Sequence, residues 1–294
     1  MYKLIFTLFF YVVCSNLSTA QQPANGGLND VGQHISAPPI PAEATFCGEK
    51  VPLEYFDVRE SLMRELNSLT YWHSSMIYTL QLAGRYMGTI ENLLKQYDVP
   101  DDLKYLCVAE SNLQNVVSPA KAAGFWQFLP GTAKEFGLEI TAEIDERYNL
   151  EKATKAACEY LKLAYKKFGN WTLTAASYNV GIAHMTNQLA VQKQKKYYDL
   201  HLNMETMRYV YRAVAYKTLM TNPEKYGFYI SPKSKFEPLL YREVTVKGPV
   251  DWIAFSEKNG TNYKVLKIFN PWIITMKLST TRTYKVKIPL KRTQ

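Results

Sequence analysis

The chain has 294 residues, of which 47% are hydrophobic and 21% are charged. This composition is typical of globular proteins and excludes a collagen-like, low-complexity or wholly disordered chain. The formal net charge is +9, and it is unevenly distributed. Residues 1–230 carry equal numbers of basic and acidic side chains, whereas residues 231–294 carry 13 Lys and Arg against 4 Asp and Glu. We therefore expect a separate basic C-terminal module with its own partner.

The first twenty residues have the pattern of an export signal. Lys3 precedes an apolar run, 4–13, and the small residues Ser18 and Ala20 suit cleavage before Gln21. We expect a signal peptide over residues 1–20 and a protein exported to the periplasm or cell envelope. Lipid attachment at Cys14 is disfavoured, because the residues before it lack the small side chain that such a site needs.

A flexible linker is expected over residues 21–46, which are rich in Pro, Ala, Gly, Asn and Gln. Three cysteines follow the signal, so at most one disulfide can form. We interpret Cys107 and Cys158 as small buried apolar residues and leave the state of Cys47 open. The four histidines are scattered along the chain, so no metal site is expected.

Helical patterns fill the middle of the chain. Apolar residues recur at helical spacing over residues 58–97, which predicts two or three helices. The capping box 132–135 predicts a helix that begins after Gly131, and Asn149 and Gly169 are the expected ends of the next one. Further helices are expected over 171–178 and 204–220. After residue 230, alternating strands at 241–246 and 283–288 enclose two helix-length segments, 251–258 and 262–269.

Glu110 is a carboxylate on an apolar helix face. It follows Leu103, Leu106 and Cys107 at helical spacing and so continues their stripe. A carboxyl held beside apolar walls has a raised pKa and can act as a general acid near neutral pH. Most glutamates do no chemistry, however, and a charge at a helix end can turn inward without a function. Position alone favours that second interpretation.

Three motifs follow one another in order. They are Glu110-Ser111, Gly124-Phe125-Trp126-Gln127 and Ser177-Tyr178-Asn179-x-Gly181. An amide flanked by aromatic residues suits a sugar-binding groove, where rings stack on sugar faces. The set resembles the motifs of lytic transglycosylases with a lysozyme-like fold, in the branch of membrane-bound lytic transglycosylase D. The resemblance covers roughly residues 51–220.

The resemblance implies a mainly α fold, with a lysozyme-like helical catalytic domain followed by a small α+β module. It implies cleavage between N-acetylmuramic acid and N-acetylglucosamine, with formation of 1,6-anhydromuramic acid ends and without any cofactor. Glu110 would be the catalytic acid and base, and Ser111 would also support its helix. The implied substrate-binding residues are Ser111, Ser118, Gln127, Tyr178, Asn179 and Tyr209.

The C-terminal segment resembles a LysM repeat, a small glycan-binding module. The resemblance rests on residues 246–248, 252–254, 266–271 and 284–289. We expect a lysozyme-like domain over residues 47–230, with its core at 90–220, and a basic LysM-like module over 231–294. The positive charge suits peripheral association with an anionic envelope.

Two alternatives stay open. A lysozyme-like hydrolase would need a second carboxylate, for which Glu135, Asp145 and Glu146 are candidates. A non-catalytic wall-binding protein would have no reason to bury Glu110 at the cost of desolvating it. In each case the expected partner is the glycan strand of peptidoglycan and not nucleic acid, and we expect a monomer.

Overall fold

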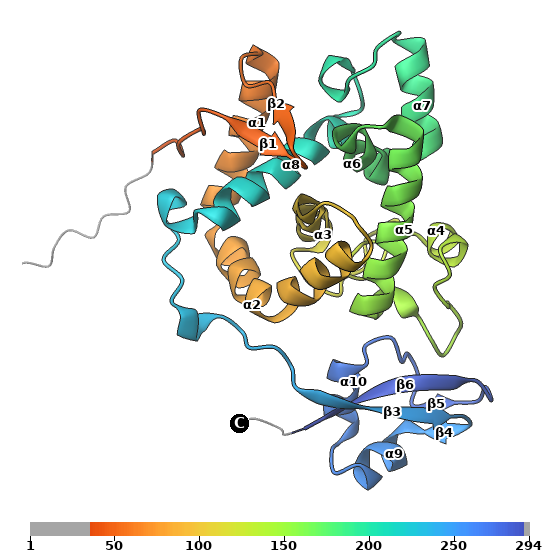
Figure 1. Ribbon diagram of the computed structural model, residues 1–294. Coiled ribbons are helices and arrows are strands. Elements are labelled where there is room, and N and C mark those ends of the chain that lie inside the picture. The colour runs from red at the N-terminus through yellow and green to blue at the C-terminus, as the bar shows by residue number, and fades with distance from the viewer. Residues whose placement is uncertain (1–35, 291–294) are drawn as a thin grey trace, which may run out of the picture. The chain divides into compact units, whose positions relative to one another are not determined.

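The computed structural model describes residues 36–290 (Figure 1). The predicted signal peptide, Cys14 and residues 21–35 of the predicted linker lie outside the described residues. Helices make up most of the described chain as far as Thr221, and strands and short helices alternate from Tyr241 to Pro289. Within residues 36–290, no helix is both long enough and apolar enough to cross a membrane.

A short antiparallel hairpin precedes the helices. Its strands are β1 (Ala44–Phe46) and β2 (Glu49–Val51), and the side chain of Phe46 is fully buried. The last three residues of the predicted linker are therefore part of a strand. Glu49 accepts hydrogen bonds from the backbone nitrogens of Trp171 (2.6 Å) and Thr172 (2.9 Å). This acidic side chain complements the positive end of the helix that begins there.

The helical domain surrounds a short central helix, α3, which contacts α2 and α8 (Figure 1). Around it α1 packs against α8, α2 against α5, and α5 against α6. The bounds of these elements are α1 (Phe56–Tyr71), α2 (His73–Gln96), η1 (Asp101–Leu103), α3 (Lys104–Ser111), α4 (Pro130–Glu135), η2 (Glu146–Tyr148), α5 (Leu150–Phe168), α6 (Trp171–Val180), α7 (Ile182–Val191), η3 (Tyr197–Asp199), α8 (Met204–Thr221), η4 (Pro223–Tyr226) and η5 (Pro232–Ser234).

Local signals explain several helix ends. The side chain of Asn149 accepts a hydrogen bond of 3.0 Å from the backbone nitrogen of Lys152, which confirms the predicted start of α5. Gly169 ends α5 in the left-handed conformation, with φ of +63°. The predicted capping box is wrong, because α4 begins at Pro130 and has no side-chain cap. Proline suits the first position of a helix, since its missing N–H has no partner there in any case.

The C-terminal module joins two helices to short sheets. Strand β3 (Tyr241–Lys247) pairs antiparallel with β6 (Thr283–Pro289), and β4 (Val250–Asp251) pairs with β5 (Lys277–Leu278). Helices α9 (Trp252–Lys258) and α10 (Tyr263–Phe269) lie between the strands in sequence. This order confirms the predicted strand-helix-helix-strand pattern. The module has its own hydrophobic cluster, with Trp252, Leu266 and Val286 fully buried.

Candidate active site

Helix α3 places Glu110 one residue before its own end. Leu103, Leu106 and Cys107 are fully buried, whereas the side chain of Glu110 is half-buried. Asn112 ends the helix with φ of +52°, a conformation that asparagine tolerates better than most residues. The Asn112 side chain accepts a hydrogen bond from Tyr216 on α8. The end of α3 is thus held against α8, which fixes the direction of the carboxyl that precedes it.

The environment of Glu110 favours its protonated form. Burial raises the pKa of Glu110 from its ordinary value of 4.5 to about 7. The hydroxyl of Tyr209 donates a hydrogen bond of 2.6 Å to Oε1 of Glu110, and this bond and the charge of Arg212 act to lower the pKa. The charge of Glu205 acts to raise it. A carboxyl with this pKa can both donate and accept a proton near neutral pH.

Three residues of helix α8 affect the pKa of this carboxyl, and only Tyr209 was among the predicted site residues. Glu205, Tyr209 and Arg212 follow one another at spacings of four and three, which places them on one helix face. Glu65 of α1 is buried and accepts hydrogen bonds from Nε of Arg208 (2.5 Å) and Nε of Arg212 (3.3 Å). The spacing signal existed in the sequence, but the pairing with Glu65 depends on the tertiary structure.

The loop after α3 supports this helix through its backbone. Gly124 has φ of +81°, and a Cβ atom there would lie 1.9 Å from the carbonyl oxygen of Arg147, so only glycine fits. The carbonyl oxygen of Phe125 accepts a hydrogen bond of 2.8 Å from Oγ of Ser111. Because Ser111 is buried and follows Glu110 directly, this contact positions the carboxyl-bearing end of α3.

Two predicted binding residues form internal contacts in the same loop. The amide nitrogen of Gln127 donates to the carbonyl oxygens of Val116 (2.9 Å) and Gly124 (2.7 Å). Oγ of Ser118 accepts a hydrogen bond of 3.1 Å from the backbone nitrogen of Ala122. Both side chains are half-buried, so each hydrogen-bonds within the loop and is also partly accessible.

The aromatic residues that flank Gln127 point inward. Phe125, Trp126 and Phe128 are each at most 3% exposed, and the indole nitrogen of Trp126 donates to Thr154 over 2.9 Å. The expectation that these rings stack on sugars is therefore wrong. They are large apolar side chains on a short loop, and the hydrophobic effect places them in the core.

Tyr178 and Asn179 lie at the end of α6 and link it to neighbouring segments. The hydroxyl of Tyr178 donates a hydrogen bond of 2.9 Å to the carbonyl oxygen of Trp126. Burial raises the pKa of Tyr178 well above its usual range, and the charge of Glu110 acts in the same direction. Oδ1 of Asn179 accepts a hydrogen bond of 2.8 Å from Thr206, and its amide nitrogen donates to Glu205 over 3.4 Å.

The three candidate second carboxylates have other environments. Asp145 forms a buried ion pair with Arg147 (2.7 Å), and Glu146 pairs with Lys152. Glu135 is exposed at the end of α4. The acidic residue whose charge acts on Glu110 is instead Glu205, which was not among the predicted second carboxylates.

Comparison with known families divides the chain into two matched regions. Residues 88–201 match the Transglycosylase SLT domain, and residues 242–292 match the Soluble lytic transglycosylase C-terminal LysM-like domain. The chain carries an SLT domain followed by a LysM-like domain. This confirms the predicted lysozyme-like helical fold with a small C-terminal α+β module.

The chain is also similar to proteins of known name. The membrane-bound lytic murein transglycosylases D of Escherichia coli K12 and of Escherichia coli O6:H1 are each 28% identical over 240 residues, 80% of this chain. The chain spans about half of their length, 52%. A protein of Alteromonas sp. (strain M-1) named for tributyltin chloride resistance is 25% identical over 193 residues, 65% of this chain and 90% of that protein.

The LysM-like domain packs against the loop that precedes η2 in the SLT domain. Ile144 precedes η2 in the SLT domain, is 1% exposed and belongs to the hydrophobic cluster of the LysM-like domain. Ile144 and Ile273 form an antiparallel β-bridge, and the backbone nitrogen of Asp145 donates to the carbonyl oxygen of Trp272 over 2.9 Å. A shared core and backbone hydrogen bonds make these two domains one packed unit.

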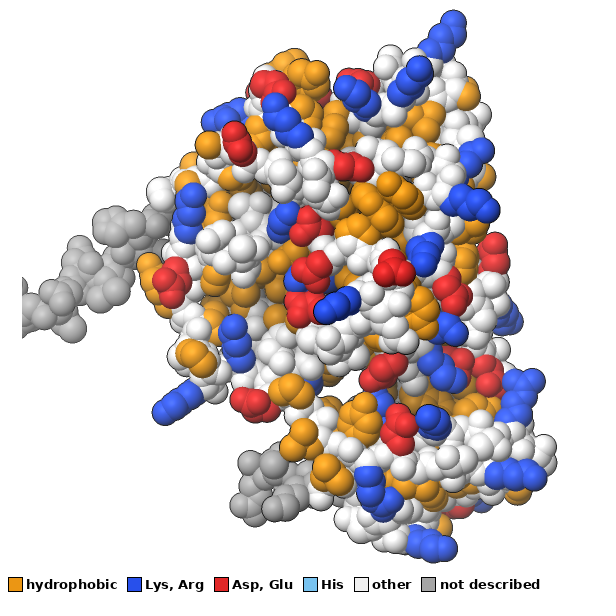
Figure 2. All heavy atoms as spheres, in the orientation of Figure 1, with side chains coloured by type: hydrophobic (Ala, Val, Ile, Leu, Met, Phe, Trp, Pro, Cys, Tyr) orange, Lys and Arg blue, Asp and Glu red, His pale blue; other side chains and the backbone are white. Residues whose placement is uncertain are grey.

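Charged contacts surround the same junction. Arg282 pairs with Glu139 (3.0 Å), Lys287 pairs with Glu151, and the backbone nitrogen of Ser279 donates to both carboxylate oxygens of Glu143, 3.1 Å each. Part of the basic character of residues 231–294 is therefore used inside the chain. Other Lys and Arg side chains of the LysM-like domain line its outer edge on the face drawn in Figure 2.

Proposed function

We propose that this chain is a peptidoglycan lytic transglycosylase in which Glu110 is the catalytic acid and base. The observation that carries the proposal is the half-buried carboxyl of Glu110, whose pKa is raised to about 7 and which hydrogen-bonds Tyr209 within an SLT domain. The substrate is the peptidoglycan strand, and the bond that is cleaved joins N-acetylmuramic acid to N-acetylglucosamine. Ser118, Gln127, Tyr178 and Asn179 contribute to the groove, while Ser111 and Tyr209 position Glu110.

The reaction uses one carboxyl group twice. Protonated Glu110 donates its proton to the glycosidic oxygen, and the bond from that oxygen to C1 of the muramic acid breaks. The 2-acetamido group stabilises the oxocarbenium-like stage. The 6-hydroxyl of the same sugar then attacks C1, and the Glu110 carboxylate accepts its proton. The products are a free N-acetylglucosamine end and a 1,6-anhydromuramic acid end, and Glu110 is again protonated.

Hydrolysis on the same fold is the second candidate function, and Glu205 is the residue that would favour it. Hydrolases of glycosides use a second carboxylate to activate water or to form an intermediate. Glu205 is exposed, and its carboxylate hydrogen-bonds Asn179. The transglycosylase reaction is favoured over hydrolysis, because the 6-hydroxyl of the sugar itself competes strongly with water. When it is well oriented, its effective concentration is on the order of 10⁵ M or more.

The setting of the activity is also a proposal. The relatives of the D type are membrane-bound murein transglycosylases by name, which is consistent with action at the cell envelope. We propose that the chain is exported, that residues 47–230 and 231–294 are its two domains, and that it acts as a monomer. Size-exclusion chromatography with light scattering tests the last point, since a dimer would have twice the mass of the single chain.

Digestion of purified peptidoglycan by matched variants tests the function. Glu110→Gln keeps the size and polarity of the side chain but removes the transferable proton, so release of soluble muropeptides falls at least about 10²–10⁴-fold. Glu135→Gln makes the same chemical change at an exposed site and serves as the control. A Glu110→Gln variant with turnover near that of wild type would show that the catalytic acid lies elsewhere.

A further inference from the structure

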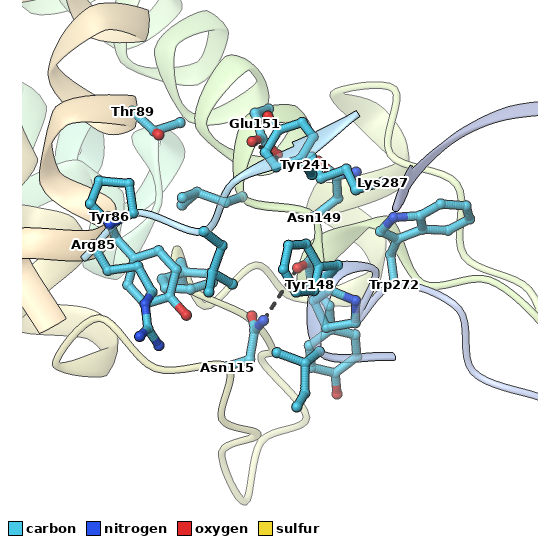
Figure 3. A pocket seen from close by; sticks show the side chains of 17 residues that line it. Arg85, Tyr86, Thr89, Asn115, Tyr148, Asn149, Glu151, Tyr241, Trp272 and Lys287 are labelled. Carbon is cyan, nitrogen blue, oxygen red and sulfur yellow. Dashed lines mark hydrogen bonds and ion pairs between the residues drawn. The ribbon is translucent and has the colours of Figure 1, made fainter. Parts of the chain in front are cut away.

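A cavity of about 150 Å³ lies where the SLT domain meets the LysM-like domain (Figure 3). We name it the junction cavity. Helix α2 contributes Arg85 and Tyr86 to its wall, η2 contributes Tyr148, and the LysM-like domain contributes Tyr241 and Trp272. Neither domain alone forms this cavity. Glu110 does not line it, so it is distinct from the candidate active site.

Aromatic rings give the junction cavity apolar surfaces with polar edges. Tyr86 and Tyr148 are half-buried and Tyr241 is exposed, so part of each of these three rings is open to a ligand. Trp272 is 4% exposed and stacks on the ring of Tyr284 (5.5 Å, 28°), so it forms the base of the cavity. Such rings pack on the C–H faces of sugars, while hydroxyl and amide groups bond to sugar oxygens. The wall chemistry is therefore that of a carbohydrate site.

The charges in the wall favour an acidic unit. Lys287 lies over the ring of Tyr241 (4.5 Å) and pairs with Glu151, so its charge is balanced. Arg85 donates through Nε to the carbonyl oxygen of Glu237 (3.1 Å), and its guanidinium carbon lies over the ring of Phe236 (5.1 Å). Within residues 36–290 it forms no ion pair. An arginine whose charge is not balanced by a carboxylate binds one strongly, and the lactyl group of muramic acid is a carboxylate when no peptide is attached.

The size of the cavity indicates part of a longer ligand. Pockets for whole small ligands measure about 300–1,000 Å³, so 150 Å³ accommodates a single unit. Resting on the proposed function, we propose that the junction cavity binds one acidic amino-sugar unit of a peptidoglycan strand, outside the bond that Glu110 cleaves. The ligand is then the same polymer that binds at the active site, and one of its units occupies the cavity.

Phe125 connects the junction cavity to the catalytic helix. Its ring lines the cavity and packs edge-on against Tyr86 (4.9 Å between ring centres). Its carbonyl oxygen accepts the hydrogen bond from Ser111, the neighbour of Glu110. The loop that carries Phe125 therefore contacts both the junction cavity and the helix of Glu110, and we expect the junction cavity to add affinity for long strands.

Binding of a sugar at the junction cavity can be measured directly in the full chain by NMR. The Glu110→Gln protein, labelled with ¹⁵N, is titrated with a peptide-free tetrasaccharide of alternating N-acetylglucosamine and N-acetylmuramic acid, and the indole resonance of Trp272 is observed. It is assigned by a Trp272→Phe variant. We expect the resonance to shift, and we expect Tyr241→Ala to reduce the shift at least fivefold. A Trp272 resonance that stays unmoved at saturation overturns the proposal.

A second arm identifies the chemical group. Arg85→Gln weakens binding of the tetrasaccharide at the junction cavity but leaves binding of chitotetraose, which has no carboxylate, unchanged. Lys264→Gln, an exposed charge change on α10, is the matched control and alters neither. Equal loss for both sugars in Arg85→Gln overturns the assignment of an acidic unit.

Kinetics separate this proposal from the proposed function. On long strands Tyr241→Ala raises KM at least threefold and leaves kcat unchanged, whereas on short soluble fragments it behaves as wild type. Absence of anhydro products from the wild-type protein would refute the function but would leave the binding titration to decide on the cavity. Wild-type kinetics of Tyr241→Ala on long strands would refute the cavity alone.

Discussion

Tyr209 donates a hydrogen bond of 2.6 Å to Glu110, from a helix that lies 99 residues further along the chain. The bond stabilises the charged form of the carboxyl, yet burial has the larger effect and keeps the pKa at about 7. Tyr209 is itself buried, so its hydroxyl holds the carboxyl in one orientation without competition from bulk water.

This relationship predicts a pH effect of Tyr209→Phe. Because the hydrogen bond lowers the pKa of Glu110, its loss raises that pKa further, by about one unit for a bond to a charged group. The proton-donating form then persists to higher pH. In wild type kcat/KM falls as pH rises through about 7, and in the variant the fall shifts upward.

Tyr216→Phe is the control for this profile, because Tyr216 lies on the same helix and donates to Asn112 instead of Glu110. A profile of Tyr209→Phe that coincides with those of wild type and Tyr216→Phe would mean that the bond has no influence on the proton transfer.

Glu110→Gln has a predicted effect on stability that depends on pH. Glu110 has a pKa of 4.5 when unfolded and about 7 when folded, so between these values the folded state binds more protons. The free energy of unfolding of wild type therefore falls as pH rises across this window. Glutamine has no such proton, so the variant gains stability relative to wild type, reaching on the order of 1–3 kcal/mol above pH 7.

Thermal unfolding at pH values near 4.5 and near 8 measures this difference. At the lower value the two proteins have similar stability, apart from the pH-independent effect of the substitution. A difference that stays constant between the two pH values would show that the pKa of Glu110 is not raised by folding.

The junction of the two domains predicts a stability effect at Ile144. Truncation of a fully buried isoleucine to alanine costs about 2–5 kcal/mol, whereas Ile253→Ala removes the same atoms from a side chain that is 41% exposed and costs about 0.5 kcal/mol or less. Chemical denaturation of the full chain gives both values. Similar losses of unfolding free energy for Ile144→Ala and Ile253→Ala would contradict the shared core. In that case a chain that ends after residue 229 would be as stable as the SLT domain in the full chain.

The sequence predicted features that depend on neighbours along the chain. The burial of Leu103, Leu106 and Cys107 followed from helical spacing, and the same spacing placed Glu110 beside them. Asn149 and Gly169 ended α5 as expected, because capping is a local hydrogen-bonding effect. Helix α7 was not predicted.

Local sequence patterns did not predict the contacts between segments that lie far apart in the chain. The burial of Ile144 depends on packing against residues of the LysM-like domain, so residues 231–294 are less independent than their charge indicated. Glu65 and Arg212 meet only when α1 packs on α8. The aromatic residues beside Gln127 show the same limit, because composition does not tell whether a ring faces the core or a groove.

Analysis of the products in oxygen-18 water tests the central claim most directly. If the 6-hydroxyl attacks C1, each cleavage leaves a 1,6-anhydromuramic acid end that is one water lighter than a reducing end and carries no label. Mass spectrometry of muropeptides released by the wild-type chain is expected to show these unlabelled ends as the main product. Reducing ends that carry oxygen-18 would contradict the account, because water would then be the nucleophile and Glu205 the first residue to examine as its activator.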